Sequence, residues 1–299
     1  MRSDLLNKSS NKYLDQLAPE KLLSWDYISC SPPIVGNIGE SADGVLADGE
    51  LMSILWPGDS GQLTGSTACS IGALTAAGGT PTVTGTIAAT DAQDTVAGLN
   101  LQMDATTADN TGIEIVFGGS QFGSVGNRFK VGVHSGSFDV TINNVDWSDF
   151  DCCGIGFRKV QAFATGHGGI LAAAGGGDPV YTDFVLFGCI TPDDVEIASD
   201  LNDSGTLVST DSTQATAAAN NHRFRVELSS AGVVTFSHIG AAAMRAGTLA
   251  APTVTKAFTF DDGDILVPYM VVQGINQNSA VYLKSIDIER TPTVDGYTQ

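Results

Sequence analysis

The feature that most constrains the fold is a series of short alternating segments between residues 111 and 290. Alternation of apolar and polar residues with a period of two is typical of β-strands that bury one face. In the segment HRFRVEL, the apolar residues alternate with Arg223, Arg225 and Glu227. Nine segments are predicted as strands: Gly112–Phe117, Arg128–His134, Ser137–Asn143, Gly154–Phe163, Tyr181–Cys189, His222–Leu228, Gly232–His238, Ile265–Gln273 and Ala280–Glu289.

The connections between these segments favour an antiparallel arrangement. A short loop that contains glycine links Leu228 to Val233, so the strands on either side are predicted to form a hairpin. Almost no helical periodicity interrupts the series, and no internal repeat suggests a propeller or a β-helix. The sequence therefore predicts an all-β fold, an antiparallel sandwich or barrel.

The first 30 residues differ in pattern from the rest. Leucines spaced mostly at threes and fours predict a helical arm over residues 1–30, with Pro19 in the first turn of a second short helix. Leu22, Leu23 and Trp25 would anchor that helix. Two placements stay open: the arm packs on the main domain, or it docks on a neighbouring subunit.

Residues 31–110 are rich in Gly, Ala and Thr and carry little apolar bulk. We expect an extended β segment that adds to a sheet edge, in this chain or in another. Because an open edge must be covered, we also expect the chain to oligomerise through this segment and the exposed edges of the sandwich. The predicted division is thus 1–30, 31–110 and 111–299.

Charge excludes several classes of function. The formal net charge is −19 with only 14 Lys and Arg, so a basic patch for nucleic acid is not expected. The acidity suits solubility and repulsion between free subunits, and a salt-rich habitat or bound divalent cations are the alternatives.

No stretch reaches the roughly 20 apolar residues of a membrane helix, and the N-terminus lacks the apolar core of a signal peptide. We therefore expect synthesis and folding in a cytoplasm.

The five cysteines have no framework pattern. Cys30, Cys69, Cys152, Cys153 and Cys189 are odd in number and irregularly spaced, and no Cys-x-x-Cys pair exists. The sequence predicts reduced, buried thiols with no disulfide and no zinc site.

One acidic segment resembles a calcium loop. Asp200, Asn202 and Ser204 place oxygen ligands at alternate positions before a glycine, and Asp211 takes the twelfth position. The alternative is a turn whose side chains cap their own backbone. The segment FDDGD at residues 260–264 offers the same two interpretations.

Catalytic patterns are missing from the sequence. Glu114, Glu196, Glu227 and Glu289 are isolated, and no glycosidase-like run of paired acids occurs. Glu227, close to two arginines, suits a solvated ladder of opposite charges on a strand. We expect no enzymatic activity.

Aromatic side chains are the other candidates for a sugar site. In a sandwich most of them are expected in the core, and a lectin site needs one or two exposed. The aromatic residues in question are Trp147, Phe150, Phe157, Phe163, Phe184 and Phe187.

The C-terminal two-thirds resembles a known kind of domain. In order, it carries TDFVLFG, DLNDSGTLVSTDST, NNHRFRVELSSAGVVTFSHIG, FTFDDGDILVPYMVVQG and VYLKSIDIERTP. This pattern resembles the concanavalin A-like (LamG-type) β-sandwich of virion proteins from tailed bacteriophages, marine ones especially. That fold hosts lectins, hydrolases and capsid parts alike, so it does not decide function.

The resemblance implies a virion structural protein, a decoration or cement protein on the outside of the capsid. Its partners would be the major capsid protein and copies of itself, with a homotrimer as an economical symmetric form. The alternative is a carbohydrate- or receptor-binding module of a head or tail fibre, which would bind a host glycan. A carbohydrate-active enzyme is a third interpretation, against which the missing acid pair argues.

Overall fold

The computed structural model describes fourteen stretches of the chain, and within them it forms 16 strands. The described residues are 20–26, 51–53, 64–74, 99–100, 111–117, 128–144, 150–161, 181–191, 194–201, 207–215, 220–240, 251–252, 257–274 and 281–292. Among these residues, no helix has both the length and the apolar character needed to cross a membrane.

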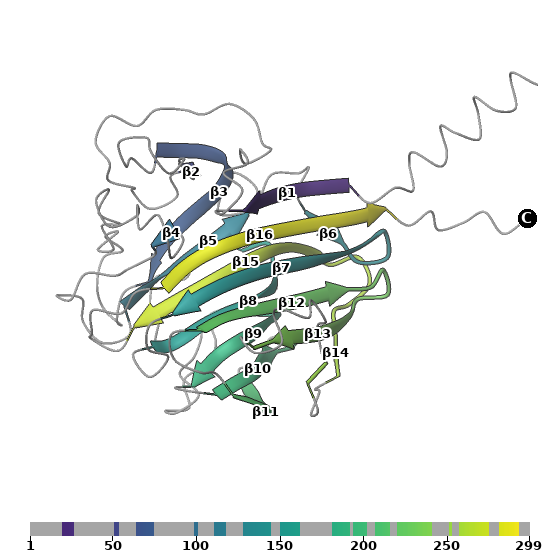
Figure 1. Ribbon diagram of the computed structural model, residues 1–299. Coiled ribbons are helices and arrows are strands. Elements are labelled where there is room, and N and C mark those ends of the chain that lie inside the picture. Colours follow the sequence, from purple (N-terminus) through teal and green to yellow (C-terminus); the bar gives the residue numbers. More distant parts are fainter. Residues whose placement is uncertain are drawn as a thin grey trace, which may run out of the picture.

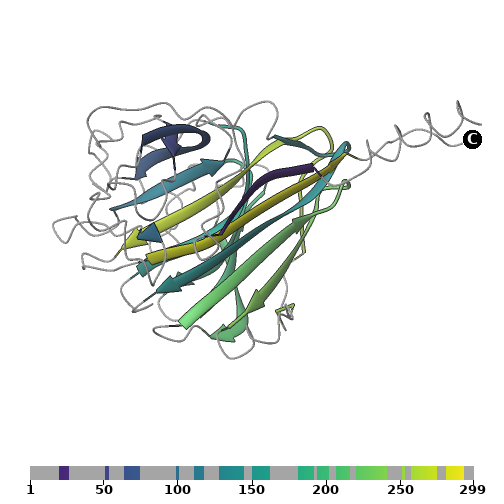
Figure 2. The ribbon, with the colours of Figure 1, turned by 45° about the horizontal axis from the view of Figure 1, so that its top comes forward.

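Seven strands form one sheet, drawn in front in Figures 1 and 2. Their order is β1 (Glu20–Asp26), β16 (Val281–Pro292), β7 (His134–Asn144), β12 (Asn220–Leu228), β13 (Val233–Ile239) and β14 (Phe258–Thr259), with β4 (Leu99–Asn100) also on β16. The hairpin predicted across Leu228 to Val233 is confirmed as β12 and β13, with Val226 opposite Phe236.

Nine strands form the second sheet behind it (Figure 1). Their order is β11 (Val208–Ala215), β10 (Asp194–Asp200), β9 (Phe184–Thr191), β8 (Phe150–Lys159), β15 (Ile265–Gly274), β5 (Thr111–Phe117), β3 (Thr64–Leu74) and β2 (Leu51–Ser53), with β6 (Phe129–Lys130) also on β15. All strand pairs of both sheets in the described residues are antiparallel. The predicted all-β antiparallel sandwich is confirmed.

The main core lies between the two sheets. Alternate residues of each strand point inward, as the period of two requires. The Phe187 ring of β9 meets Phe224 of β12 edge to face at 5.6 Å and Phe236 of β13 at 5.2 Å. These aromatic contacts join the sheets across the layer.

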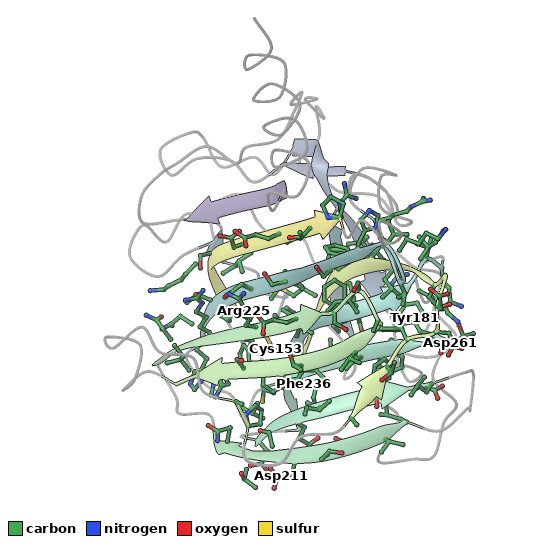
Figure 3. All side chains as sticks on the ribbon, turned by 90° about the vertical axis from the view of Figure 1, so that its right-hand side faces the viewer. Cys153, Tyr181, Asp211, Arg225, Phe236 and Asp261 are labelled. Atoms are coloured by element: carbon green, nitrogen blue, oxygen red, sulfur yellow. The ribbon has the colours of Figure 1, made fainter. Side chains whose placement is uncertain are left out.

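A second apolar cluster covers the outward face of the nine-stranded sheet. Its members include Phe184 and Leu186 of β9 and Tyr269 of β15, which alternate with main-core residues and so lie on the opposite face. Fully buried Arg158 lies with them, its guanidinium carbon 4.5 Å from the centre of the Tyr181 ring. In Figure 3 the labels of Arg225 and Tyr181 lie on opposite sides, with Cys153 and Phe236 between them.

The N-terminal prediction needs correction. Residues Glu20–Asp26 form strand β1 at the sheet edge beside β16, not a short helix (Figure 1). The register pairs Leu23 with Ile288 and Trp25 with Ile286, both buried core residues. Spacing by two therefore prevails over the leucine spacing by threes and fours. The part of the arm before residue 20 lies outside the described residues.

Part of the predicted extended segment 31–110 also adds to an edge of this chain's own sandwich. Strand β3 pairs with β5, and β2 pairs with β3 at the end of the nine-stranded sheet. Addition to an edge was one of the two arrangements expected for this segment. The three-part division and assembly through residues 31–110 stay predictions.

A β-bulge explains the irregular alternation of the last strand. The register of β16 against β7 shifts between Leu283 and Ser285. Leu283 can therefore share the core with Ile286 and Ile288, although strict alternation would put it on the other face.

The strand predicted over Arg128–His134 is interrupted by a turn. Gly132 has φ +89°, and an added Cβ there would meet Asp262. Three turns are tied together at this end of the sandwich. Gly132 N donates to Ser230 O at 2.7 Å, Gly263 N to Val131 O at 3.2 Å, and Phe260 N to Gly232 O at 3.0 Å.

Candidate functional site

The outward face of the seven-stranded sheet is polar and orderly. Alternation on β12 directs Arg223, Arg225 and Glu227 away from the core. The register sets them in rows with residues of neighbouring strands. Two of these rows are Thr235–Glu227–Ser137–Glu289 and Ser237–Arg225–Asp139–Asp287, running from β13 across β12 and β7 to β16.

Asp139 is the centre of this face. Its two carboxylate oxygens accept hydrogen bonds from Nε and Nη2 of Arg223, each at 2.6 Å, and Arg225 Nη1 lies 3.4 Å from Oδ2. The hydrogen bond to Asp139 raises the pKa of Arg223, which outweighs the opposing effect of burial, and the charges of Asp139 and Asp287 add to it. Asp139 of β7 and Asp287 of β16 are directly opposite each other. The positive charges of Arg223 and Arg225 therefore offset the repulsion between these two carboxylates.

The predicted ladder of opposite charges is confirmed at Glu227. Its Oε1 accepts from Arg225 Nη2 at 2.8 Å and from Nε at 3.0 Å. The Glu227 side chain stays 46% exposed, so it can also meet solvent or a ligand.

A groove of about 330 Å³ opens on this face, beside Arg225. Glu227 and Glu289 lie on either side of Ser137, two strands apart, so their backbones are about 10 Å from each other. The groove is lined by Ser135, Gly136, Ser137, Arg225, Glu227, Leu228, Ser229, Val233, Thr235, Glu289 and Thr291.

This lining offers a guanidinium, two carboxylates and several hydroxyls around a small apolar surface. Charged donors and acceptors make the stronger hydrogen bonds to neutral hydroxyl groups. Val233, which is 42% exposed, supplies the apolar part. The arrangement is chemically suited to holding a small polyhydroxylated molecule.

The groove is a weaker candidate for acid–base catalysis. Hydrolysis of a glycoside by two carboxyl groups needs one of them in an apolar environment that favours its protonated form. Glu227 is instead exposed and held by Arg225. The expectation that the chain is not an enzyme stays a prediction.

The four residues proposed for calcium divide between described and undescribed parts of the chain. Asp200 ends β10 and is buried, and its Oδ1 accepts from Leu201 N at 2.8 Å. Asp211 lies on β11 opposite Glu196, four residues along the ladder from Asp200 and so roughly 13 Å away. Asn202 and Ser204 lie outside the described residues. The structure thus does not bring Asp200 and Asp211 together, and the calcium site stays a prediction.

The sequence 260–264 behaves as the alternative interpretation expected. Asp264 Oδ2 accepts from Asp261 N at 3.0 Å, and Gly263 takes φ +89°, so the carboxylate caps its own turn. Asp264 Oδ1 also lies 3.1 Å from Lys159 Nζ, which contacts Asp183 Oδ2 at 2.6 Å. Burial lowers the pKa of Lys159, but the bonds to the two aspartates outweigh it and raise this pKa. Figure 3 places Asp261 and Asp211 far apart.

Three of the candidate aromatic residues belong to the core. Phe157, Phe184 and Phe187 are completely buried, as expected for a sandwich. Trp147 and Phe163 lie outside the described residues, and the Phe150 side chain is not described. Among the described residues, no aromatic side chain lines the groove.

Two histidines that the sequence analysis did not single out meet inside the seven-stranded sheet. His222 Nδ1 and His238 Nε2 are 2.9 Å apart, and the planes of the two rings are within 6° of parallel. Both are buried. Burial, and after it the neighbouring His222, lowers the pKa of His238 to about 3. Their pairing depends on cross-strand register, which a single sequence does not display.

The groove residues were found in the sequence only in part. The alternation on β12 had already placed Arg223, Arg225 and Glu227 on one face. Ser137 and Glu289 join them only through the pairing of β7 with β12 and β16. The signal that could have helped is the alternation in β7, where Ser137, Asp139 and Thr141 separate buried apolar residues.

Comparison with known proteins found similarity to solved structures but not to characterised sequences. No protein-family model matches it, and no curated protein matches it by sequence. Peanut lectin, solved with a nine-residue peptide, is similar at 13% identity and a TM-score of 0.45, over 77% of this chain and 94% of that one. Winged bean acidic lectin, solved with methyl-α-D-galactose, is similar at 10% identity and a TM-score of 0.44, over 76% and 94%.

The structure of a bacterial protein aligns with nearly all of the chain. It is a protein of unknown function from Shewanella oneidensis MR-1, similar at 10% identity and a TM-score of 0.44 over 97% of both chains. At these identities and TM-scores the likeness is one of overall fold alone. It extends neither to residues nor to ligands.

Proposed function

We propose that this chain is a non-catalytic binding module that holds a carbohydrate in the groove of its seven-stranded sheet. The observation that carries the proposal is the lining of that groove. Arg225, Glu227, Ser137 and Glu289 line it together on a platform of neighbouring strands β12, β7 and β16. Such a set can donate to and accept from neighbouring hydroxyls of one sugar ring.

The platform is held in place before any ligand arrives. Arg225 is already oriented by Glu227 and Asp139, so its ordering costs little when a ligand binds. The groove is open to solvent, so a single site should bind weakly. Several copies on one assembly would raise the overall affinity, in keeping with the predicted oligomer.

The test is a binding measurement with the purified full-length chain. A glycan array would identify a sugar, and titration calorimetry would follow with Glu227→Ala. We expect at least about a tenfold loss of affinity, because a hydrogen bond to a charged group contributes about 1.5–3 kcal/mol. The matched control is Glu196→Ala, which removes a partly exposed glutamate of the other sheet, from β10.

Two results would overturn the proposal. One is an array with no bound sugar for the wild-type chain under conditions that detect weak lectins. The other is a bound sugar whose affinity Glu227→Ala and Glu196→Ala reduce equally.

The capsid decoration role, its capsid partner and the virion location remain proposals derived from the sequence. A decoration protein and a glycan-binding fibre differ in copy number. Quantitative mass spectrometry of a purified particle would therefore separate them: hundreds of copies support decoration, and a few copies support the fibre.

A further inference from the structure

Two cysteines of the nine-stranded sheet face each other across neighbouring strands. Cys153 of β8 is directly opposite Cys189 of β9. The same row continues to Val272 of β15 on one side and Val195 of β10 on the other. All four residues belong to the main core.

Directly opposite positions suit a disulfide. Facing Cα atoms of antiparallel strands are roughly 4.5 or 5.5 Å apart, and both values lie within the range of roughly 4.4–6.8 Å that disulfides span. Neither cysteine is disulfide-bonded in the structure. The sequence analysis predicted no disulfide, and with residues 154–188 between the two cysteines their spacing does not reveal this pairing.

Burial determines when such a bond can form. Both side chains are completely buried, and burial, followed by the neighbouring Cys189, raises the pKa of Cys153 well above its usual value. The thiolate is the species that attacks, so the folded chain should resist oxidation. The unfolded chain exposes both thiols at their ordinary reactivity.

We infer that Cys153 and Cys189 are a cross-strand thiol pair that closes to a disulfide when the chain folds in an oxidising compartment. With oxidised glutathione, the Cys153 thiolate attacks one sulfur, forms a mixed disulfide and releases one glutathione. The Cys189 thiolate then attacks the Cys153 sulfur and releases the second. The two protons lost by the cysteines leave on the two glutathiones, so the protein is oxidised by two electrons.

The test compares the full-length chain produced in a reducing cytoplasm with the same chain exported to an oxidising periplasm. After alkylation under denaturing conditions and digestion, we expect a peptide with Cys153 linked to one with Cys189 in the periplasmic protein only. Its mass should be two hydrogens below the sum of the two peptides. The oxidised chain should also unfold in urea with an equilibrium constant about 100-fold lower than the reduced chain.

Three variants make the assignment specific. Cys153→Ala and Cys189→Ala should each abolish the linked peptide, and Cys152→Ala should leave it in place. Cys152 is the matched control, because the register pairs it with Gln273. The inference fails if both thiols of the exported wild-type chain are fully alkylated, or if the linked peptide survives either of the first two variants.

Discussion

The outward face of the seven-stranded sheet carries Asp139, Arg225 and Glu227, whereas the outward face of the nine-stranded sheet carries Leu186 and Tyr269. The same strand geometry therefore serves two different environments. On β12 one residue in two is apolar, and the other face is polar. On β9 the run FVLFGCI is apolar almost throughout, because both faces are buried. Alternation of apolar and polar residues thus indicates a strand with one solvent-facing side. A continuous apolar run indicates a strand that is buried on both sides.

The largest change in the free energy of unfolding should come from a substitution on the buried outward face of the nine-stranded sheet. Leu186→Ala removes a completely buried side chain from the second cluster and should lower the free energy of unfolding by about 2–5 kcal/mol. Urea unfolding measures this change. A loss below about 1 kcal/mol would mean that this face is solvated in solution, and the comparison of the two faces would fail.

Acid should act on the seven-stranded sheet through its inner side. The pKa of His238 is lowered to about 3, beneath its value near 6.5 in the unfolded chain. The unfolded state therefore binds more protons between these values, and stability should fall as the pH falls below about 6.5. The slope should approach about 1.4 kcal/mol per pH unit.

Urea unfolding of wild type and His238→Phe between pH 7 and pH 4.5 checks this effect. The variant should lose the part of the slope that His238 contributes. The control is His134→Gln, in the partly exposed first position of β7, which should keep it. Equal slopes for wild type and His238→Phe would exclude the buried histidine as the source.

A smaller effect is expected at the centre of the polar face. Asp139→Asn keeps the shape but removes the charge that Arg223 and Arg225 share. Because both arginines are about one-third exposed, we expect a loss of about 1–2 kcal/mol, less than for a fully buried pair. A double-mutant cycle with Arg223→Met measures the coupling, and additive losses would show that the bidentate pair does not contribute.

The smallest change should come from the groove itself. Glu227→Ala should alter the free energy of unfolding by less than about 0.5 kcal/mol, because the side chain is exposed and its ion pair is at the surface. Circular dichroism and urea unfolding would verify this. A large loss would mean that the ladder is structural, and the binding test at Glu227 would need Thr235→Ala in its place.

The fold could be predicted from the sequence where a local pattern alone determines the structure of a segment. The β12–β13 hairpin follows from alternation plus a glycine in a short loop. Strand β1 was missed because Leu22, Leu23 and Trp25 satisfy helical and strand spacing at once, and only pairing with β16 decides between them. Strands β10 and β11 were missed because their polar ends looked like an acidic loop.

The residues of the candidate site were harder to predict from the sequence than the fold. Arg225 and Glu227 are neighbours along β12, so their ion pair could be foreseen. Ser137 precedes Glu227 by 90 residues and Glu289 follows it by 62, so only the pairing of β7 with β12 and β16 brings the three together. The same holds for Cys153 and Cys189, whose proximity is a property of register and not of spacing.

The three turns joined at one end of the sandwich have a practical meaning for protein engineering. Their backbone groups bond to one another. A side chain at Gly232 would collide with the backbone oxygen of Phe260, and Gly132 has φ +89°, which residues with a Cβ rarely adopt. A peptide tag or a grafted loop at residues 131–133 or 230–232 would break bonds in its neighbours as well, so these turns are poor insertion points. Gly263 is different, since a Cβ there would meet nothing within 4 Å. A label attached through an L residue at position 263 would therefore meet no neighbouring atom, but the φ of +89° would strain the backbone there.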